Sequence, residues 1–599
     1  MSVDVSAVAR VLGIGVSFLN LQPGGSSFLP QRIAVFAQGA TATTYSTTKK
    51  QITSSAQAGA VYGFGSPIHL IARELFPDNG DGVGTIPVTV YPLADHASGA
   101  VSLGDITPSG NPAVASSYRV RIGGLLGDSF TVPAGNLATA ANLHIALRAL
   151  GKSFNSILNM PVTVTWTYGS VTASSITGTG NGTLTALSVT GAPVPGAWTL
   201  KVNTAVTNGG VWTLTDPDGN VITTTLTQTV GVGQATVFTA GGLQFTVTDG
   251  TTDFALNDQF TITVPATKVN GTSKWKGVSA NKIVFEVIPS GDSLVTFTLT
   301  QPTGGLNNPS SAQQTAALNQ IGNVWETMLL NAMEITDTTT LDGFSTFGEG
   351  RWGDLMHKPL VCFTGGTDAA VATATTVPSG RKTDRTNVQL VAPGSVNLPF
   401  VVAARQLARI AKVANNNPPT DYGAQSMANL IPGTDAQQWD YPTRDLAVKA
   451  GCSTTVVSDG VVFIGDVVTF YHPDGDPNPA YRYVVDIVKL QNVIYSTALR
   501  FATTEWAAAP LIPDGQATAN PNARRPRDAK AAMASVIDGL GLSAIISDPK
   551  TAKKSIVAAI DGSNPKRLNL SATVQLSGNT NVKSVDVFFG FFFGQAIAA

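Results

Sequence analysis

The sequence predicts a multi-domain α+β protein in which an all-β sandwich interrupts an α/β-type core and extended strands stand at both ends of the chain. Three observations lead to this prediction. Strand and helix patterns alternate near the start of the chain and return after residue 276. Short strands rich in Thr, Gly and Val, with few charges, lie between these two regions. Both ends of the chain carry apolar residues, where chains are usually polar.

The first part of the α/β core is expected over residues 31–100. Two apolar runs, at 33–36 and 86–91, are typical of buried strands, and residues 68–76 between them predict a helix. Pro77 and the turn that follows it end this helix. The strand–helix–strand order is typical of a parallel sheet.

The middle of the chain is expected to be mainly β. A peripheral β-rich domain with one helix, at 139–150, is predicted over 101–170 and 269–300. Short strands at regular spacing over 171–268 predict an inserted immunoglobulin-like β-sandwich. The two ends of such an insert must lie close together, because the host domain continues across it. The strand at 162–166 is expected to find its partner at 274–281.

Helices return in the main α/β domain, predicted over 301–510. Ser311 and Gln314 have the spacing of a capping box at the start of a helix. This helix is expected to continue to residue 334, since its apolar residues form one stripe: Leu318, Ile321, Trp325, Met328 and Leu329.

The remainder of this domain alternates helices and strands. Pro399 begins a second helix, and residues 481–501 predict a third, with Leu499 among the side chains expected to be buried. Strands are expected at 461–464 and 467–471. A C-terminal domain is expected over 511–582, with a final strand over 583–599. It includes a strand from 568 to 576 and a segment at 555–560 that is compatible with either helix or strand.

The last strand is unusually apolar. Five of the 25 phenylalanines lie between Phe588 and Phe593. Burial of one Phe gains roughly 1.5–3 kcal/mol, so the segment must enter the core of its own subunit, a membrane or another subunit. A membrane is disfavoured because a spanning helix needs about 20 apolar residues. The residues predicted to bind another subunit are Val585, Val587, Phe588, Phe589, Phe591, Phe592 and Phe593.

Residues 1–30 predict a matching N-terminal arm, because apolar and polar residues alternate before a flexible Pro-Gly-Gly segment. Two extended apolar termini on a folded chain favour β-augmentation, in which each arm adds a strand to the sheet of a neighbour. Pairing of the C-terminal strand within its own subunit remains the alternative. The N-terminal arm residues are Val3, Val5, Val8, Val11, Ile14 and Val16.

Charge and composition narrow the function. Charged residues make up 13% of the chain and the net charge is −1, which disfavours nucleic acid as a partner. Little charge repulsion opposes self-association, although Gly, Ala and Thr in a β-rich chain also explain the low charge. Two cysteines, Cys362 and Cys452, cannot form a disulfide framework and fit a reducing cytoplasm.

No catalytic or metal motif is found in the sequence. The five histidines are scattered, and neither a phosphate-binding glycine loop nor a nucleophile elbow is present. The acidic segments 78–82 and 474–478 lack the residues of a calcium loop and are interpreted as solvated turns. We therefore expect a protein that is not an enzyme and has no cofactor or metal, although catalytic residues can also assemble over long sequence distances.

Several stretches, in the same order along about 500 residues, resemble the contractile-tail sheath proteins of myoviruses, specifically the Mu-like sheath group. A departure from this group is the sandwich at 171–268, where relatives usually carry only a hairpin. The matching stretches are 63–66 through 92–95, 351–353, 361–365, 397–404, 430–433, 459–462, 468–471 and 564–568.

The resemblance implies a helical sheath that surrounds a tail tube and contracts to drive the tube through the host envelope. Its expected partners are further copies of itself, the tail tube protein, and baseplate and tail terminator proteins, with no nucleic acid and no direct membrane insertion. The expected location is the virion, after assembly in the host cytoplasm. The rival hypothesis is a tail-fibre or adhesin-type virion protein that binds the host surface through its β-sandwich.

A charge asymmetry refines this expectation. Residues 515–599 contain ten Lys or Arg against five Asp, which is +5, whereas the remaining residues sum to −6. We expect the inner domain, 511–582, to face an acidic tube and the sandwich to face outward; a merely solvated basic face is the alternative. The residues predicted to face the tube are Arg524, Arg525, Arg527, Lys530, Lys550, Lys553 and Lys554.

Overall fold

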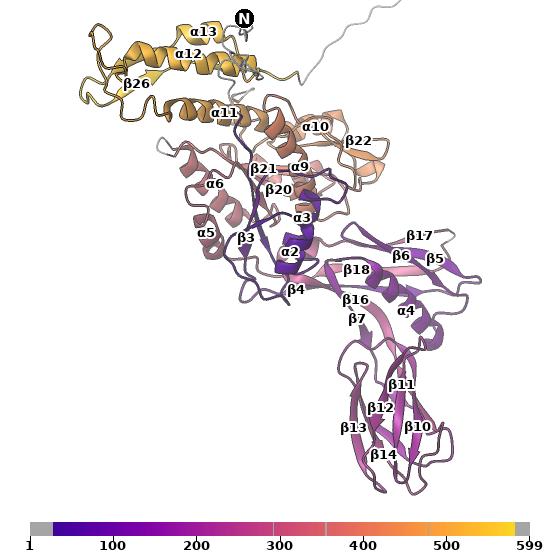
Figure 1. Ribbon diagram of the computed structural model, residues 1–599. Coiled ribbons are helices and arrows are strands. Elements are labelled where there is room, and N and C mark those ends of the chain that lie inside the picture. Colours follow the sequence, from indigo (N-terminus) through magenta and orange to yellow (C-terminus); the bar gives the residue numbers. More distant parts are fainter. Residues whose placement is uncertain (1–27, 292, 354–355, 477–478, 581–599) are drawn as a thin grey trace, which may run out of the picture.

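The computed structural model describes residues 28–580, apart from residues 292, 354–355 and 477–478. The described chain is elongated, with a helical C-terminal part at one end, an α/β part in the middle and a β-rich region at the other end (Figure 1). The predicted mixed α+β class is confirmed. Of the predicted N-terminal arm, 1–30, only residues 28–30 are described, and the predicted C-terminal arm, 583–599, lies outside the described residues.

Within residues 28–580, six strands form the central sheet, in the order β2-β3-β1-β19-β20-β21. β2 runs antiparallel to β3, and the other neighbours are parallel. The central strands are buried along their whole length, as expected of a parallel sheet covered on both faces. The bounds are β1 Ile33–Gln38, β2 Lys50–Ile52, β3 Val88–Leu93, β19 Met328–Asn331, β20 Val361–Gly366 and β21 Asn387–Val391.

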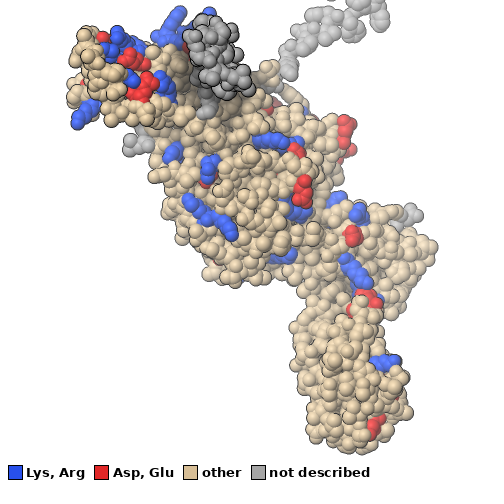
Figure 2. Space-filling model, in the orientation of Figure 1, with Lys and Arg blue, Asp and Glu red and all other residues tan. Residues whose placement is uncertain are grey.

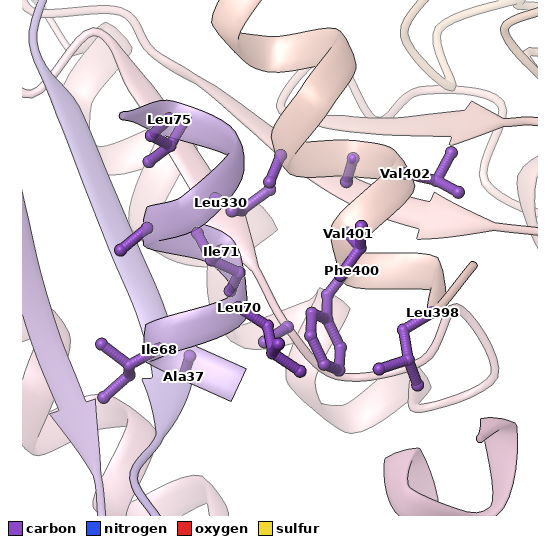
Figure 3. Close-up of a cluster of buried hydrophobic side chains, with 14 of the residues drawn as sticks. Ala37, Ile68, Leu70, Ile71, Leu75, Leu330, Leu398, Phe400, Val401 and Val402 are labelled. Atoms are coloured by element: carbon purple, nitrogen blue, oxygen red, sulfur yellow. The ribbon is translucent and has the colours of Figure 1, made fainter. Parts of the chain in front are cut away.

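Helices cover the two faces of this sheet. On one side lie α2 (Ser55–Tyr62), α3 (Pro67–Leu75) and α9 (Pro399–Asn416), and on the other α5 (Ser311–Asn319) and α6 (Thr338–Trp352) (Figure 1). Figure 3 shows the contact between α3 and α9, where apolar side chains from both helices meet over the sheet. The buried side chains labelled there include Leu70, Ile71, Phe400 and Val401.

The helix predicted from 311 to 334 is wrong in its second half. Its capping box is formed by Ser310 and Gln313, one residue earlier than expected, and α5 ends at Asn319. Met328–Asn331 is instead the strand β19, which pairs with β1 and β20. A short apolar run fits either a helical stripe or a buried strand, and here the backbone pairing with β1 decides.

Two further expectations from this region need correction. Residues 467–471 make isolated bridges, Val468 with Tyr483 and Thr469 with Val388, instead of a regular strand. Leu499 is 47% exposed, although the helix α11 (Val484–Phe501) otherwise follows the prediction. The remaining elements of the region are α7 Val371–Ala374, α8 Thr376–Ser379, α10 Tyr441–Lys449, β22 Thr455–Ser458 and β23 Val461–Ile464, with a 3-10 turn at Asp435–Gln437.

A β-rich region adjoins the carboxyl ends of the central strands. One sheet has the order β18-β4-β16-β7 and another β17-β5-β6, and α4 packs against strands of both. The expected partner of the strand at 162–166 is wrong: these residues of β7 pair with residues 269–273 of β16 and not with 274–281, where β16 ends at Lys276 and a 3-10 helix covers Val278–Lys282. The bounds are β4 Val101–Ser109, β5 Ser116–Ile122, β6 Leu125–Val132, α4 Ala140–Ser156, β7 Val162–Tyr168, β16 Ala266–Lys276, β17 Phe285–Pro289 and β18 Thr296–Thr303.

Between β7 and β16, two antiparallel sheets enclose a separate hydrophobic core that includes Trp198, Trp212 and Phe245. One sheet has the order β12-β11-β10-β15-β8 and the other β13-β14-β9. The bounds are β8 Thr172–Ala173, β9 Thr183–Val189, β10 Gly196–Val206, β11 Gly209–Thr215, β12 Val221–Thr227, β13 Ala235–Ala240, β14 Leu243–Thr248 and β15 Gln259–Val264. Whether this sandwich is immunoglobulin-like stays a prediction.

The ends of the sandwich are close together, since the Gly169 N–H donates to the Pro265 carbonyl over 3.0 Å. β16 begins at Ala266, so the predicted limit of the insert at residue 268 falls inside this strand. Contacts with the host region include Arg148, which bonds the Asp218 carboxylate and the Pro195 carbonyl, and Tyr168, whose hydroxyl donates to the Pro193 carbonyl.

The C-terminal part has a small core of its own, which includes Val493, Ile537 and Ile545. It consists of α11 Val484–Phe501, α12 Pro526–Leu542, α13 Pro549–Lys554, β24 Ile546–Ser547, β25 Val557–Ile560, β26 Leu568–Ser571 and β27 Gln575–Leu576. The ambiguous segment at 555–560 thus contains a strand, and the strand expected over 568–576 is divided into two. Across the described chain, no helix combines the length and the apolar character needed to span a bilayer.

We predict that residues 170–264 can be replaced by a short Gly-Ser turn without unfolding the host region. The sandwich has its own core, and the loss of its few bonds to Arg148 and Tyr168 should change the free energy of unfolding by no more than about 2 kcal/mol. Urea denaturation of the unpolymerised protein, followed by circular dichroism, checks this. Aggregation of the shortened chain, or loss of its cooperative transition, would show that the sandwich is integral to the fold.

Candidate functional site

The helix α11 lies between the central sheet and the remainder of the C-terminal part (Figure 1). One of its faces is apolar, yet it also buries the polar side chains of Lys489, Gln491 and Asn492. Gln491 donates to the Pro359 carbonyl over 3.0 Å, just before β20, and so ties the helix to the amino ends of the parallel strands. The other two side chains hold the chain where it enters and leaves the described fold.

The entering chain is held by Asn492. Its Oδ1 accepts a hydrogen bond from the Leu29 N–H over 2.8 Å, while its Nδ2 donates to the Val488 carbonyl one turn earlier in the helix. Phe28 packs against the core of the C-terminal part. Two residues after Leu29, the Gln31 N–H donates to Asn415 of α9 over 3.1 Å. The strand β1 then begins at Ile33.

The leaving chain is held by Lys489, whose side chain has no exposed surface. Its ammonium donates to the Ser577 carbonyl over 2.5 Å and to Asn579 Oδ1 over 2.6 Å, and it pairs with Asp486 at 3.0 Å. Asn579 in turn donates to the Pro419 carbonyl over 2.8 Å. A buried ammonium needs several acceptors to replace water, and the departing chain supplies two of them.

Lys489 and Asn492 are three residues apart on one helix. They therefore lie next to each other on the same face of the helix, about 5–6 Å apart between Cβ atoms. Leu29, near the first described residue, bonds Asn492. Ser577 and Asn579, near the last described residue, bond Lys489. The roots of both predicted arms thus lie side by side on α11. The arm residues themselves, Val3 to Val16 and Val585 to Phe593, are outside the described residues, and their role stays a prediction.

Neither Lys489 nor Asn492 was singled out from the sequence. A signal was present, because both fall on the stripe formed by Val485, Val488 and Val493, where a polar residue must be satisfied inside the protein. The atoms that satisfy them come from positions 29, 577 and 579, and no local pattern connects these positions to the helix.

The seven predicted basic residues lie on or beside α12 and α13. Four of them are exposed, namely Arg527, Lys530, Lys550 and Lys554. The other three are half-buried: Lys553 pairs with Asp538 at 2.7 Å, Arg524 lies 3.7 Å from Glu505, and Arg525 donates to the Gln516 carbonyl.

Figure 2 shows Lys and Arg gathered at the C-terminal end of the molecule, with Asp and Glu among them. Residues 515–580 contain nine Lys or Arg and four Asp, so the positive excess belongs to the described part of this region. Lys530, Lys550 and Lys554 form no ion pair with a described residue, although Lys550 and Lys554 lie near enough to Asp548 for their charges to act on it.

Among the described residues, neither the two cysteine thiols nor the potential metal ligands form a reactive site. Burial raises the pKa of both cysteine thiols, Cys362 and Cys452, well above the usual range, which makes them poor nucleophiles. In the part of the chain that the structure describes, no group of three or more His, Cys, Asp or Glu side chains is arranged around a possible metal ion.

The calcium-like segment 78–82 has a structural use. Its Asp81 accepts hydrogen bonds from Arg405, over 2.9 Å, and from Arg409, both on α9. These bonds hold the loop after α3 against α9. The other acidic segment begins with Asp474, which pairs with Lys382 at 2.6 Å.

Comparison with known proteins adds to this geometry. Over 327 residues the chain is 24% identical to the Mu-like prophage FluMu tail sheath protein of Haemophilus influenzae. The resemblance to the Mu-like tail sheath group is confirmed. The match covers 52% of this chain and 64% of the relative, so it spans slightly less than two thirds of the length of that sheath protein.

No protein-family model matches the chain. Among solved structures, the chain is 11% identical to a sheath tail protein from Listeria innocua, with 93% of this chain and 94% of that chain covered and a TM-score of 0.41. For a sheath tail protein from Desulfitobacterium hafniense the values are 10% identity, 94% and 100% coverage, and a TM-score of 0.40. At these scores the structural likeness adds nothing to the match in sequence with the Mu-like sheath protein.

We predict that Lys489→Met loosens the root of the C-terminal arm. Ser577 and Asn579 lose a buried charged donor, which should lower the free energy of unfolding by about 1–3 kcal/mol and expose the chain after residue 576 to proteases. The matched control is Lys449→Met, which removes an exposed pair with Asp445 on α10 and should cost about 0.5 kcal/mol or less. Urea denaturation and limited proteolysis measure both effects, and equal effects of the two variants would contradict an anchoring role.

Proposed function

We propose that the chain is a structural subunit of a contractile phage tail, which polymerises as a helical sheath around the tail tube and contracts to drive the tube through the host envelope. The observation that carries this proposal is the match over 327 residues to a Mu-like prophage tail sheath protein. The low net charge of −1 is compatible with extensive self-association. Assembly in the host cytoplasm and a final location in the virion follow from this role.

Neighbouring subunits are linked by strand exchange of their terminal arms. Support comes from the two arm roots, which lie one helical turn apart on α11, and from the apolar residues of both arms. An arm that leaves one subunit and pairs with the next makes a heterologous contact, and contacts of this kind generate helical filaments when they do not close into a ring. Adjacent roots deliver both arms from the same point of each subunit.

The C-terminal part faces the tail tube, and the sandwich faces outward as an immunoglobulin-like decoration. Support comes from the opposite positions of these two regions in the elongated molecule (Figure 1). The three unpaired lysines at the C-terminal end suit a weak, salt-screened contact with an acidic tube, which can be released on contraction. Baseplate and tail terminator proteins are the expected partners at the ends of the sheath.

Contraction in this proposal requires a change of packing and no catalysis. The extended sheath is a metastable arrangement of subunits, and a trigger at the baseplate allows each subunit to repack against the next. The arms keep subunits attached while the globular parts move.

We predict that removal of residues 583–599 yields a soluble protein that forms no tubes. The truncation removes the Phe run, which in the proposed assembly is the segment that binds the neighbouring subunit. The matched control removes only residues 595–599, keeps Phe588–Phe593 and should assemble normally. Negative-stain microscopy should show hollow ribbed cylinders for the full chain and the control; cylinders from the longer truncation would refute arm exchange, and discrete trimers from the full chain would favour a fibre.

We also predict that Lys530→Glu combined with Lys554→Glu weakens binding of the sheath to its tube without preventing self-assembly. The two changes reverse exposed charges in the C-terminal part, and the effect should be largest at low ionic strength, where screening is weak. The control is Lys201→Glu, the same kind of substitution on an exposed residue of the sandwich, with half of the total change of charge. Co-sedimentation of sheath and tube over a salt series measures binding, and equal behaviour of the two variants would exclude an electrostatic contact at this end.

A further inference from the structure

Buried polar side chains without partners gather at the end of the sandwich that is farthest from the rest of the molecule. Asp249 is 3% exposed and Gln228 is 2% exposed. Neither amide atom of Gln228 nor the indole Nε1 of Trp212 has a hydrogen-bond partner, and no described side chain bonds the Asp249 carboxylate, on which only the adjacent Gly250 N–H acts. Native proteins rarely leave so many buried polar atoms unsatisfied at one place.

Strand register brings Asp249 and Gln228 to the same end of the sandwich from different sheets. Gln228 directly follows β12, and its N–H donates to the Gly210 carbonyl over 2.9 Å. The chain then crosses to the other sheet, where Ala235 at the start of β13 pairs with Thr248, the residue before Asp249. Asp249 continues the alternation of Leu243, Phe245 and Val247, whose side chains are buried in the core.

Two buried glycines near these groups each leave room for a methyl group in ordinary van der Waals contact with its neighbours. A Cβ added at Gly210 would have as its nearest neighbour Trp212 Nε1, at 3.5 Å, and one added at Gly209 would lie 3.6 Å from the nearest atoms, which include the Gln228 carbonyl oxygen. Both glycines are buried, so this space lies inside the sandwich. Space next to unsatisfied polar atoms is the usual setting of an internal ligand or water.

No described cation pairs with the carboxylate of this space. Burial, and after it the nearby charge of Asp253, raise the pKa of Asp249, while the Gly250 N–H acts in the opposite direction. Asp253 is exposed at the rim, where one of its oxygens accepts the Asn208 N–H over 3.0 Å. A carboxylate, an amide oxygen and a second carboxylate open to solvent are hard oxygen donors, which Ca²⁺ prefers.

We propose that this end of the sandwich binds one Ca²⁺ ion through the Asp249 carboxylate and Gln228 Oε1, with Asp253 and water completing the shell from the solvent side. Trp212 Nε1 and Gln228 Nε2 then donate to water molecules bound to the ion. The ion joins the two sheets at their outer end, because Gln228 directly follows β12 of one sheet and Asp249 directly follows β14 of the other. With so few charged ligands, its affinity falls in the weak class of calcium sites, with a Kd of about 10⁻⁴–10⁻³ M.

Terbium luminescence of the full-length chain tests this site. Tb³⁺ prefers the same oxygen ligands, and excitation of the adjacent Trp212 should sensitise its emission. We expect emission that follows a binding curve for one site and is displaced by Ca²⁺, and a rise in the unfolding temperature of the sandwich when millimolar Ca²⁺ is added to calcium-free protein. The variant Asp249→Asn should lose both signals, because its affinity for the ion should fall by at least about 10–100-fold. Losses of that size follow even when a residue that only bonds a metal ligand is removed.

The control is Asp459→Asn, which changes an exposed aspartate in the turn between β22 and β23, at a positive φ that Asn tolerates. It should keep both signals. Because Asp249→Asn could also disturb folding, Gln228→Glu supplies a second test, since an added carboxylate should tighten Ca²⁺ binding at this site. If the wild-type chain gives no emission that Ca²⁺ displaces, or if Gln228→Glu is destabilised and Ca²⁺ does not restore its stability, the space holds only water and the proposal is overturned.

Discussion

The parallel pairing of β1 with β19 is the interaction on which the rest of the molecule depends. It joins residues 33–36 to residues 328–331 at the centre of the sheet, so the N-terminal α/β part and the later one share a single core. Everything between residues 101 and 303 must then leave the sheet and return to it. Long-range pairing of this kind is costly in chain entropy and is stabilised here by burial on both faces of the sheet.

The direction of β1 also separates the two ends of the molecule. At its amino end, Leu29 and Gln31 bond to Asn492 and Asn415, and the C-terminal part lies over this end of the sheet. At its carboxyl end, Gln38 donates to the Lys276 carbonyl, so the β-rich region begins there. Parallel strands bring all their amino ends to one edge, which places the arm roots at the opposite end of the molecule from the sandwich. In the proposed sheath this arrangement separates the assembly contacts from the decorated surface.

Much of this organisation could be predicted from the chain itself. The buried strands at Ile33 and Val88, the helix after Pro399 and the low-charge β insert each follow from a local pattern of residues. Local patterns failed at Met328–Asn331, because four apolar residues fit a helix or a strand equally well and the partner that decides lies almost three hundred positions away. They also missed Lys489, whose buried charge is compensated by backbone and side-chain oxygens from residues 577 and 579.

The sequence by itself determined the class of the protein, the presence of an insert, the apolar character of the two termini and the likeness to a sheath family. Each of these is a property of neighbouring residues, of composition or of motif order, and none of them requires a known contact. Only the tertiary structure decided that residues 29, 577 and 579 bond the same helix and that Asp249 and Gln228 are both buried at one end of the sandwich. Such facts depend on which distant strands pair and in what register, and a shift of one residue would turn Asp249 out toward water.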